Sequence, residues 1–256
     1  MKRILILVIS FLLFTGITQA QEKKNLNEET EFYSPVPPKV TPGAAFRDAP
    51  SDAIILFDGR NLDQWVNTKD STAASWIVAD NAMTVNKNTG DIQTRSSFKD
   101  YQLHIEYRIP ANITGAGQSR GNSGIFLAAL PWGAGGYELQ VLDNYDNPTY
   151  VNGQAGSIYK QAVPLVNACL KPGVWQTYDV VWTAPVFSES GMLKSLARVT
   201  VFHNGVLVQN NTTILGDTPW IGQPSYRKHG AAPIKLQAHG DKSEPLSYRN
   251  IWVRPL

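Results

Sequence analysis

Two short segments of the sequence carry residues suited to binding sugars at alternating positions. Glu138 and Gln140 alternate with apolar residues in the first segment, and Gln237 and His239 do so in the second. Successive side chains of a β-strand point to opposite faces, so each pair shares a face away from its apolar neighbours. A carboxylate, two amides and an imidazole supply the donors and acceptors that sugar hydroxyls require. We predict a carbohydrate site centred on Glu138 and His239; the alternative is a solvated outer face of a sheet.

Loop residues around these segments extend the candidate site. The run GNSG at 121–124, which contains Asn122, allows a sharp turn or a close approach of the backbone. Trp132 lies in a glycine-rich loop, where it could stack on a sugar ring or cover the edge of the core. Asp143 and Asp146 follow the Glu138 segment and are weak candidates for binding Ca²⁺. Their run lacks the spacing of an EF-hand loop, which favours a loop of Asx turns.

A third alternating set consists of His104, Glu106 and Arg108, opposite the apolar residues of 101–109. Charges of mixed sign along a strand are typical of exposed surface. We therefore expect this set to be solvated.

Several catalytic motifs are missing from the sequence. It contains no Walker loop, no dinucleotide-binding GxGxxG, no HExxH and no GxSxG. Glu138 and Asp143 are too far apart, and on opposite faces, to form the paired carboxylates of a one-strand glycosidase motif. A second acid for a conventional glycosidase would have to come from another segment, such as Glu106.

The elements that position these residues are predicted to be short strands separated by Gly, Asn, Asp and Pro. HNGV at 203–206 and the Asp80-Asn81 pair are typical of tight hairpin turns. A parallel α/β fold needs helical crossovers, which the pattern lacks. The pattern predicts an all-β fold, a two-sheet antiparallel jelly-roll sandwich. We expect strands at 53–57, 76–79, 82–85, 101–109, 123–130, 137–142, 156–159, 176–183, 197–203, 206–210, 234–238 and 246–254.

The N-terminal region is divided into two segments ahead of the predicted domain. Residues 1–20 have a basic start, an apolar stretch and small residues before Gln21, which predicts a cleaved signal peptide. Residues 21–50 are polar and then rich in proline, which predicts an extended tether. Residues 51–256 are predicted to form a single jelly-roll domain. The protein is expected to be exported, either periplasmic or secreted. No cysteine stands where a lipoprotein would carry its lipid.

Charge and cysteine content narrow the class of partner. The full chain has 23 Lys and Arg against 21 Asp and Glu, and loss of the predicted signal leaves 21 of each sign. A neutral chain lacks the basic surface that nucleic acids or anionic membranes require, so neither is expected as a partner. We also expect no membrane span after signal cleavage. Cys169 is the only cysteine, which rules out an internal disulfide and suits a periplasm.

The spaced motifs together resemble the 3-keto-disaccharide hydrolase family. They run in order over nearly all of 54–256 and include LFDGRNLDQW, NSGIFL, YELQVLDN, GSIYKQ, IKLQAHG and YRNIWVRPL. The resemblance implies a concanavalin A-like jelly roll of the lectin and glucanase type. It also implies an exported enzyme that cleaves 3-keto-glycosides, by elimination followed by hydration.

The resemblance also suggests roles for individual residues. Glu138 and His239 would be the catalytic acid and base, in an order that the sequence leaves open. The enolate formed at the ketone would be stabilised by Lys160, by Arg120 or by a bound divalent metal. The side chains expected to orient the substrate hydroxyls are Gln140, Gln237, Asn122 and Arg249.

The chain departs from the family pattern at two positions. Ala238 stands where the family commonly has Asp beside the histidine, and Ala128 stands where it commonly has Arg. Alternation places Ala238 on the face opposite His239, so we expect an indirect effect. A non-catalytic carbohydrate-binding module and a conventional glycosidase with a carboxylate pair remain alternative functions.

Overall fold

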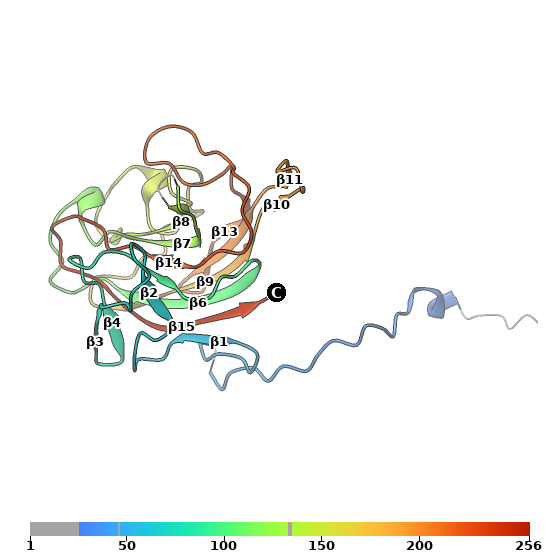
Figure 1. Cartoon of the computed structure of the whole chain (residues 1–256). Coiled ribbons are helices and arrows are strands. Elements are labelled where there is room, and N and C mark those ends of the chain that lie inside the picture. Colours follow the sequence, from blue (N-terminus) through green and yellow to red (C-terminus); the bar gives the residue numbers. More distant parts are fainter. Residues whose placement is uncertain (1–25, 46, 133–134) are drawn as a thin grey trace, which may run out of the picture. The chain divides into compact units, whose positions relative to one another are not determined.

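The chain folds into two antiparallel β-sheets packed face to face, in a computed structural model that describes residues 26–45, 47–132 and 135–256 (Figure 1). The larger sheet contains β1 (Ile54–Phe57), β3 (Ile77–Ala79), β4 (Ala82–Thr84), β6 (Tyr101–Arg108), β9 (Trp175–Thr183), β12 (Arg198–His203), β13 (Val206–Thr213) and β15 (Ser247–Pro255). The smaller sheet contains β2 (Trp65–Asn67), β5 (Ile92–Thr94), β7 (Ser123–Ala129), β8 (Gly136–Val141) and β14 (Lys235–Leu236). The described residues also form a separate hairpin of β10 (Val186–Phe187) and β11 (Leu193–Ser195), and the 3-10 turns η1 (Leu26–Thr30), η2 (Gly117–Ser119) and η3 (Val151–Gly153).

The order of the strands confirms the predicted all-β jelly-roll sandwich. The larger sheet runs β13-β12-β9-β6-β15-β4-β3, and β1 also pairs with β15. The smaller sheet runs β2-β5-β14-β7-β8, so strands distant in the sequence lie side by side. In particular, β14 pairs with β7 and β7 pairs with β8, so that only β7 separates the His239 segment from the Glu138 strand.

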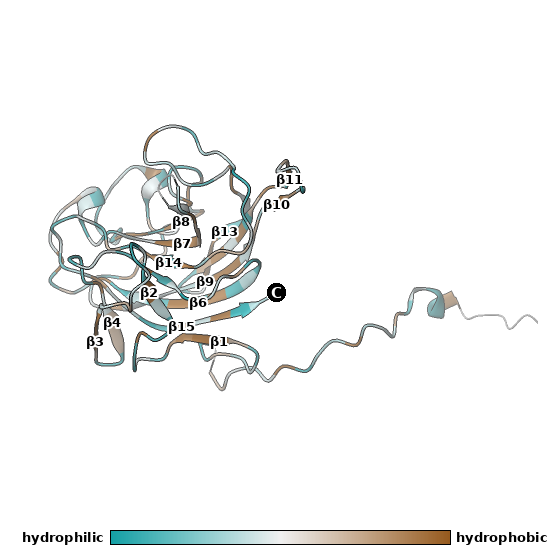
Figure 2. Ribbon diagram, viewed as in Figure 1, coloured by the Kyte–Doolittle hydropathy of each residue, from teal (hydrophilic) through white to brown (hydrophobic). Residues whose placement is uncertain are grey.

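The core lies between the two sheets. The alternate residues of β6 that the sequence assigned to the core are all buried there, as are Ile125, Leu127, Leu139 and Val141 of the smaller sheet. Tyr101 donates a hydrogen bond across the sandwich to the carbonyl oxygen of Leu127, at 2.6 Å. Figure 2 shows the apolar residues concentrated on the strands. The polar residues of β7, β8 and β14 must therefore face away from the larger sheet.

Both predicted tight turns are confirmed. Asn204 and Gly205 have φ of 53° and 79°, and they join β12 to β13 where His203 pairs with Val206. Asp80 and Asn81 have φ of 52° and 57° and join β3 to β4. Positive φ at both central residues is the signature of a type I′ turn.

Some predicted strands differ from the structure. The segment 156–159 pairs with its neighbours only through bridges at Ile158, and 234–238 shortens to β14. Short strands β2, β5, β10 and β11 were not predicted, because two or three residues are too few to show alternation.

The prediction that His104 and Glu106 are solvated was wrong, since both side chains are buried. His104 stacks on Trp252 at a ring distance of 5.4 Å, and its Nδ1 lies 2.7 Å from Asp179. Burial alone would raise the pKa of Glu106, but hydrogen bonds from His104, Asn250 and Arg249 lower it to about 2. Alternation correctly places this set away from the core, but it cannot show that Trp252 covers the same face.

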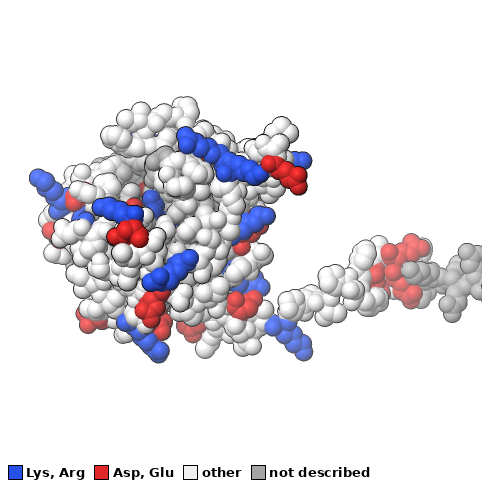
Figure 3. All heavy atoms as spheres, viewed as in Figure 1, with Lys and Arg blue, Asp and Glu red and all other residues white. Residues whose placement is uncertain are grey.

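The compact unit that contains the sandwich begins at Val40, within the Pro-rich segment, whereas the sequence analysis places the start of the domain at residue 51. The predicted signal peptide, at 1–20, lies outside the described residues. None of the helices in the described ranges has the length and hydrophobicity that a membrane crossing requires. Lys and Arg side chains are interspersed with Asp and Glu over the visible face (Figure 3).

Candidate functional site

The smaller sheet positions the candidate residues in rows across β14, β7 and β8. Phe126 pairs with Lys235 on one side and with Glu138 on the other. In the next row, Gly124 pairs with Gln140 and its carbonyl oxygen accepts a hydrogen bond from the backbone of Gln237. The two pairs predicted from alternation therefore meet on the outer face of the smaller sheet.

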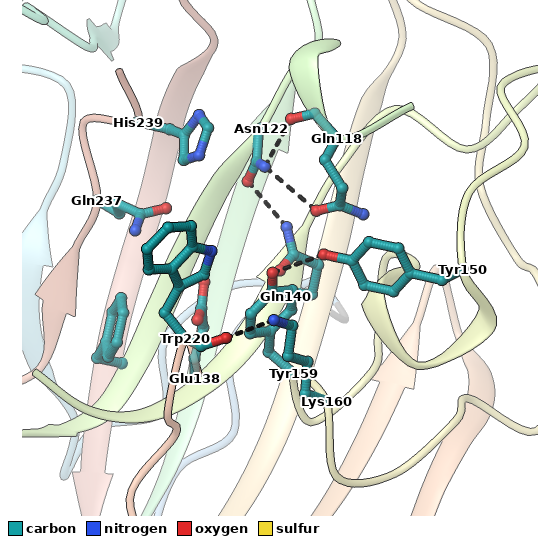
Figure 4. Close-up of a pocket in the computed structure, with 11 residues that line it drawn as sticks. Gln118, Asn122, Glu138, Gln140, Tyr150, Tyr159, Lys160, Trp220, Gln237 and His239 are labelled. Carbon is teal, nitrogen blue, oxygen red and sulfur yellow. Dashed lines mark hydrogen bonds between the residues drawn. The ribbon is translucent and has the colours of Figure 1, made fainter. Parts of the chain in front are cut away.

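These rows form the floor of a pocket of about 450 Å³ (Figure 4). Such a volume is within the roughly 300–1,000 Å³ that small-molecule sites occupy. Segments outside the smaller sheet complete the walls. The lining residues are Gln118, Asn122, Phe126, Glu138, Gln140, Tyr150, Tyr159, Lys160, Trp220, Gln237 and His239.

Glu138 is the most strongly perturbed acid in the pocket. Its side chain is almost fully buried, and burial raises its pKa to about 8, with Asp91 adding to the rise and Lys235 opposing it. No hydrogen bond within the described residues contributes to this shift. A carboxyl group in this environment is protonated at neutral pH and can donate its proton.

Gly124 creates the space that the Glu138 carboxyl group fills. A Cβ atom at position 124 would overlap Oε1 of Glu138 and lie 3.0 Å from its Cδ. The φ of Gly124 is not in the left-handed region, so the requirement for glycine here is one of space.

A partly buried ion pair lies on the other side of Phe126. The ammonium of Lys235 is 3.4 Å from Asp91 and 3.6 Å from the centre of the Phe126 ring. Burial lowers the pKa of Lys235, and Asp91 works against that effect. Lys235 does not line the pocket; it reaches Glu138 only through its charge.

His239 is oriented by a carboxylate two residues further along the chain. Its Nδ1 is 2.7 Å from Oδ2 of Asp241, and Asp241 also accepts hydrogen bonds from Ser243 and Lys87. Burial alone would raise the pKa of Asp241, but the hydrogen bonds from Ser243, His239 and Lys87 lower it. An ionised carboxylate on Nδ1 leaves Nε2 of a neutral imidazole free to accept a proton. The histidine therefore has a carboxylate partner in Asp241, although Ala238 carries none.

A chain of amides holds the end of the pocket next to His239. Gln140 donates to Asn122 at 2.9 Å, Asn122 donates to the carbonyl oxygen of Gln118 at 2.8 Å, and Gln118 donates to Thr149. By contrast, Oε1 of Gln237 is buried and has no hydrogen-bond partner among the described residues. A buried acceptor without a partner costs free energy, which a bound hydroxyl group can recover.

The structure brings six of the predicted site residues together and places three elsewhere. The residues in the pocket are Glu138, His239, Gln140, Gln237, Asn122 and Lys160. Arg120 does not line it, because it is paired with Asp143 at 2.6 Å. Arg249 lies on the larger sheet, bonded to Glu106 and 4.2 Å from the Trp175 ring. Trp132 packs against the core with Arg227 over its ring, which matches the covering role.

The loop after β8 is organised by its own amides. Asp143 is buried against Arg120, whereas Asp146 is exposed. Asn147 donates to the carbonyl oxygens of Asp143 and Gly117. Within the described ranges, no group of three or more His, Cys, Asp or Glu side chains is suited to a metal ion.

Six residues of the candidate site were missed by reasoning from the sequence. Asp241 could have been found, because it follows His239 closely in a polar run. Tyr150, Tyr159 and Trp220 have no periodic signal, since they lie outside the strands of the sheet that they approach. Gln118 and Gly124 act through contacts that only the fold reveals.

The fold is the jelly-roll sandwich that carbohydrate-active enzymes use. The chain belongs to the family of 3-keto-alpha-glucoside-1,2-lyase-like domains, whose model matches residues 52–254. The resemblance to 3-keto-disaccharide hydrolases is thereby confirmed. The family supports a glycoside hydrolase or lyase.

Solved structures agree with this assignment. A crystal structure at 2.13 Å of a protein from Parabacteroides distasonis ATCC 8503, described as a candidate glycosyl hydrolase, is 58% identical, with a TM-score of 0.84. The match covers 90% of this chain and 96% of that one. A second candidate glycosyl hydrolase from the same organism, at 1.70 Å, is 18% identical over 80% of this chain and 94% of its own, with a TM-score of 0.58, and shows the fold alone. A comparison with curated proteins found no match.

Proposed function

We propose that this protein cleaves glycosides carrying a ketone at C3, by elimination across C1 and C2 followed by addition of water. The observation that supports this most directly is the pairing of two proton-transfer groups in one pocket. Glu138 keeps its proton up to about pH 8, and His239 has its Nδ1 held by Asp241. Elimination needs one acid and one base, and the family description names a 1,2-lyase.

His239 is the base in this proposal. The ketone at C3 acidifies the C2 proton, which Nε2 removes, and the electron pair forms an enolate. As the enolate collapses, the bond between C1 and the leaving oxygen breaks, and Glu138 donates its proton to that oxygen. The products are an enone and a free alcohol. Water then adds, with its hydroxyl going to C1 and a proton from His239 to C2, while the ionised Glu138 takes the remaining proton of the water. Both groups return to their starting states.

Lys160 and Gln237 hold the substrate in this proposal. Lys160 lines the pocket; its ammonium donates one hydrogen bond to the carbonyl oxygen of Trp220 and has further protons to offer the C3 oxygen, where negative charge develops. The unpartnered Oε1 of Gln237 accepts a hydrogen bond from a sugar hydroxyl. The amide chain through Asn122 keeps Gln140 in place.

A conventional glycosidase fits the pocket less well. Such enzymes need two carboxyl groups flanking the bond, and Glu138 is the only acid among the described residues that line the pocket. Glu106, the second acid considered from the sequence, belongs to β6 of the larger sheet and is bonded to Arg249.

The test is incubation with methyl 3-keto-glucosides of both anomers beside the unoxidised glucosides. We expect release of 3-keto-glucose from an oxidised substrate only, with exchange of the C2 hydrogen for deuterium in D₂O. Cleavage of the plain glucoside would instead indicate a conventional glycosidase. Binding of the oxidised sugar without turnover would indicate a non-catalytic module.

Two variants test the assigned base. His239→Ala should abolish both turnover and C2 exchange. Asp241→Asn removes the charge that holds Nδ1, so it should lower kcat by about 10²-fold while leaving KM nearly unchanged. Lys242→Ala, at an exposed neighbour outside the pocket, is the control. Unchanged kcat in His239→Ala would contradict the assignment.

A further inference from the structure

The acid and base chemistry leaves one side of the pocket unexplained. Tyr150, Tyr159 and Trp220 line the pocket and are here called the aromatic wall. Figure 4 shows Tyr150 on the opposite side of the pocket from His239 and Gln237, with the Trp220 indole beside Gln237 and in front of Glu138. The proposed proton transfers need none of these rings.

The aromatic wall is built from three segments that hydrogen bonds join together. The hydroxyl groups of Tyr150 and Tyr159 are 2.5 Å apart, and the backbone of Lys160 donates to Asn152. The ammonium of Lys160 donates to the carbonyl oxygen of Trp220. The Gln161 side chain accepts from the backbone of 215 and donates to the carbonyl oxygen of 216. The backbone beneath Trp220 is therefore anchored although its side chain is free.

Trp220 exposes more apolar surface than the fold requires. Its side chain is 71% exposed, and the adjacent Ile221 is 79% exposed. Neither residue belongs to the apolar core or packs against it. Large apolar side chains gathered beside a polar pocket are typical of a binding surface.

The pocket has a polar floor and an aromatic wall, which suit different parts of a glycoside. The polar floor presents Glu138, Gln140 and Gln237, which suit a ring bearing hydroxyl groups and a ketone. The aromatic wall includes Trp220, the most exposed ring among the described residues that line the pocket, and a departing group needs such an open side. Flat rings prefer offset or edge-to-face contact with other aromatic rings.

We propose that the aromatic wall is a subsite for the leaving group, and that this enzyme prefers glycosides whose leaving group is a planar aromatic ring. The preference rests on the proposed elimination. Trp220 is the residue that determines it.

The test compares phenyl and methyl 3-keto-glucosides, in both anomers, with the wild type, Trp220→Ala and Trp220→Phe. We expect the wild-type kcat/KM to be roughly tenfold or more higher for phenyl than for methyl. Because a phenolate also leaves more readily, the deciding result is the effect of the variant. Trp220→Ala should lose roughly tenfold on the phenyl substrate and nothing on the methyl substrate, and Trp220→Phe should keep most of the activity. Met192→Ala, at an equally exposed apolar residue outside the pocket, is the control.

An equal loss on both substrates would overturn the proposal, because Trp220 would then stack on the sugar ring itself. No loss on either would also overturn it. Calorimetric binding of unoxidised phenyl and methyl glucosides separates this inference from the proposed reaction. If no keto-glucoside is cleaved, tighter phenyl binding that Trp220→Ala removes would keep the subsite and reject the reaction. Equal binding of the two would reject the subsite.

Discussion

Glu138 and His239 are prepared for proton transfer by opposite environments. No described residue donates a hydrogen bond to the carboxyl group of Glu138, and burial raises its pKa to about 8. His239 remains partly exposed, with its Nδ1 fixed by the buried Asp241. Two titratable groups in one pocket, with environments that separate their roles, are the usual arrangement for acid and base catalysis.

The burial of Glu138 predicts a pH limit for activity. The general acid must be protonated, so kcat should fall as the pH rises through about 8. Glu138→Gln should lower kcat by at least about 10²-fold below pH 7, because an amide cannot supply the proton, and the difference should shrink above pH 8 as the wild type loses that proton. Steady-state kinetics between pH 5 and pH 10, at saturating substrate, measures both effects. A rate that holds constant through pH 10 would contradict the role of Glu138 as acid.

The same substitution should stabilise the fold. In the unfolded chain this carboxyl ionises near its ordinary pKa of 4.5, whereas in the folded chain it does so near 8. Between these values the folded state binds more protons, so the free energy of unfolding falls as pH rises. Glu138→Gln removes that cost, which is on the order of a few kcal/mol at about 1.4 kcal/mol per pKa unit. Urea denaturation should show the gain at pH 8 and little at pH 4. If Glu138→Gln changed the free energy of unfolding by the same amount at both pH values, the result would contradict a buried carboxyl group with a raised pKa.

At the scale of the element, the paired strands β7 and β8 together position the carboxyl group of Glu138. Glu138 leans over Gly124 of the neighbouring strand, and nothing larger than hydrogen fits between them. Ala is compatible with the extended backbone of β7, so Gly124→Ala should keep the sheet while displacing the carboxyl group. Misplacement of a catalytic group by about 1 Å can cost roughly 10²-fold in rate, and we expect a loss of that size in kcat. The double variant with Glu138→Gln should show no further loss.

A matched position provides the control for this experiment. Gly240 lies between His239 and Asp241 in the sequence. A Cβ atom at position 240 would meet no atom within 4 Å. Gly240→Ala should therefore leave kcat unchanged. Equal kcat in Gly124→Ala and the wild type would show that the acid does not depend on this space.

Alternation along the strands predicted the elements and half of the site. It placed Glu138 with Gln140, which lie on β8, and Gln237 with His239, although both of these lie beyond the end of β14. It could not show that β14 pairs with β7, since strand order is a property of the whole sheet. Alternation could not predict the role of Trp220, because the sequence of an irregular loop does not indicate which surface the loop approaches. His104 was misassigned for the same reason: alternation gives a direction but does not say what covers it.

At the scale of the whole molecule, the two outer faces of the sandwich are covered differently. The smaller sheet leaves an open pocket over Glu138. On the larger sheet, Arg47 lies before the first strand, and its carbonyl oxygen accepts hydrogen bonds from Asn250 and from Trp252, which stacks on His104. The segment that precedes β1 thus helps to close the face opposite the pocket, where the chemistry requires no access.

The contacts of the segment before β1 predict how the stability of the chain responds to truncation. Compared with a chain beginning at Gln21, a chain beginning at Val40 should unfold at the same urea concentration, because the compact unit starts there. A chain beginning at Ser51 loses both hydrogen bonds to Arg47 and exposes Trp252, so it should lose about 2 kcal/mol or more. Turnover should persist in both, since the pocket lies on the other sheet. Equal loss of stability in the two truncations would show that the cover begins before Val40. No loss in the shorter chain would show that residues 40–50 do not stabilise the sandwich.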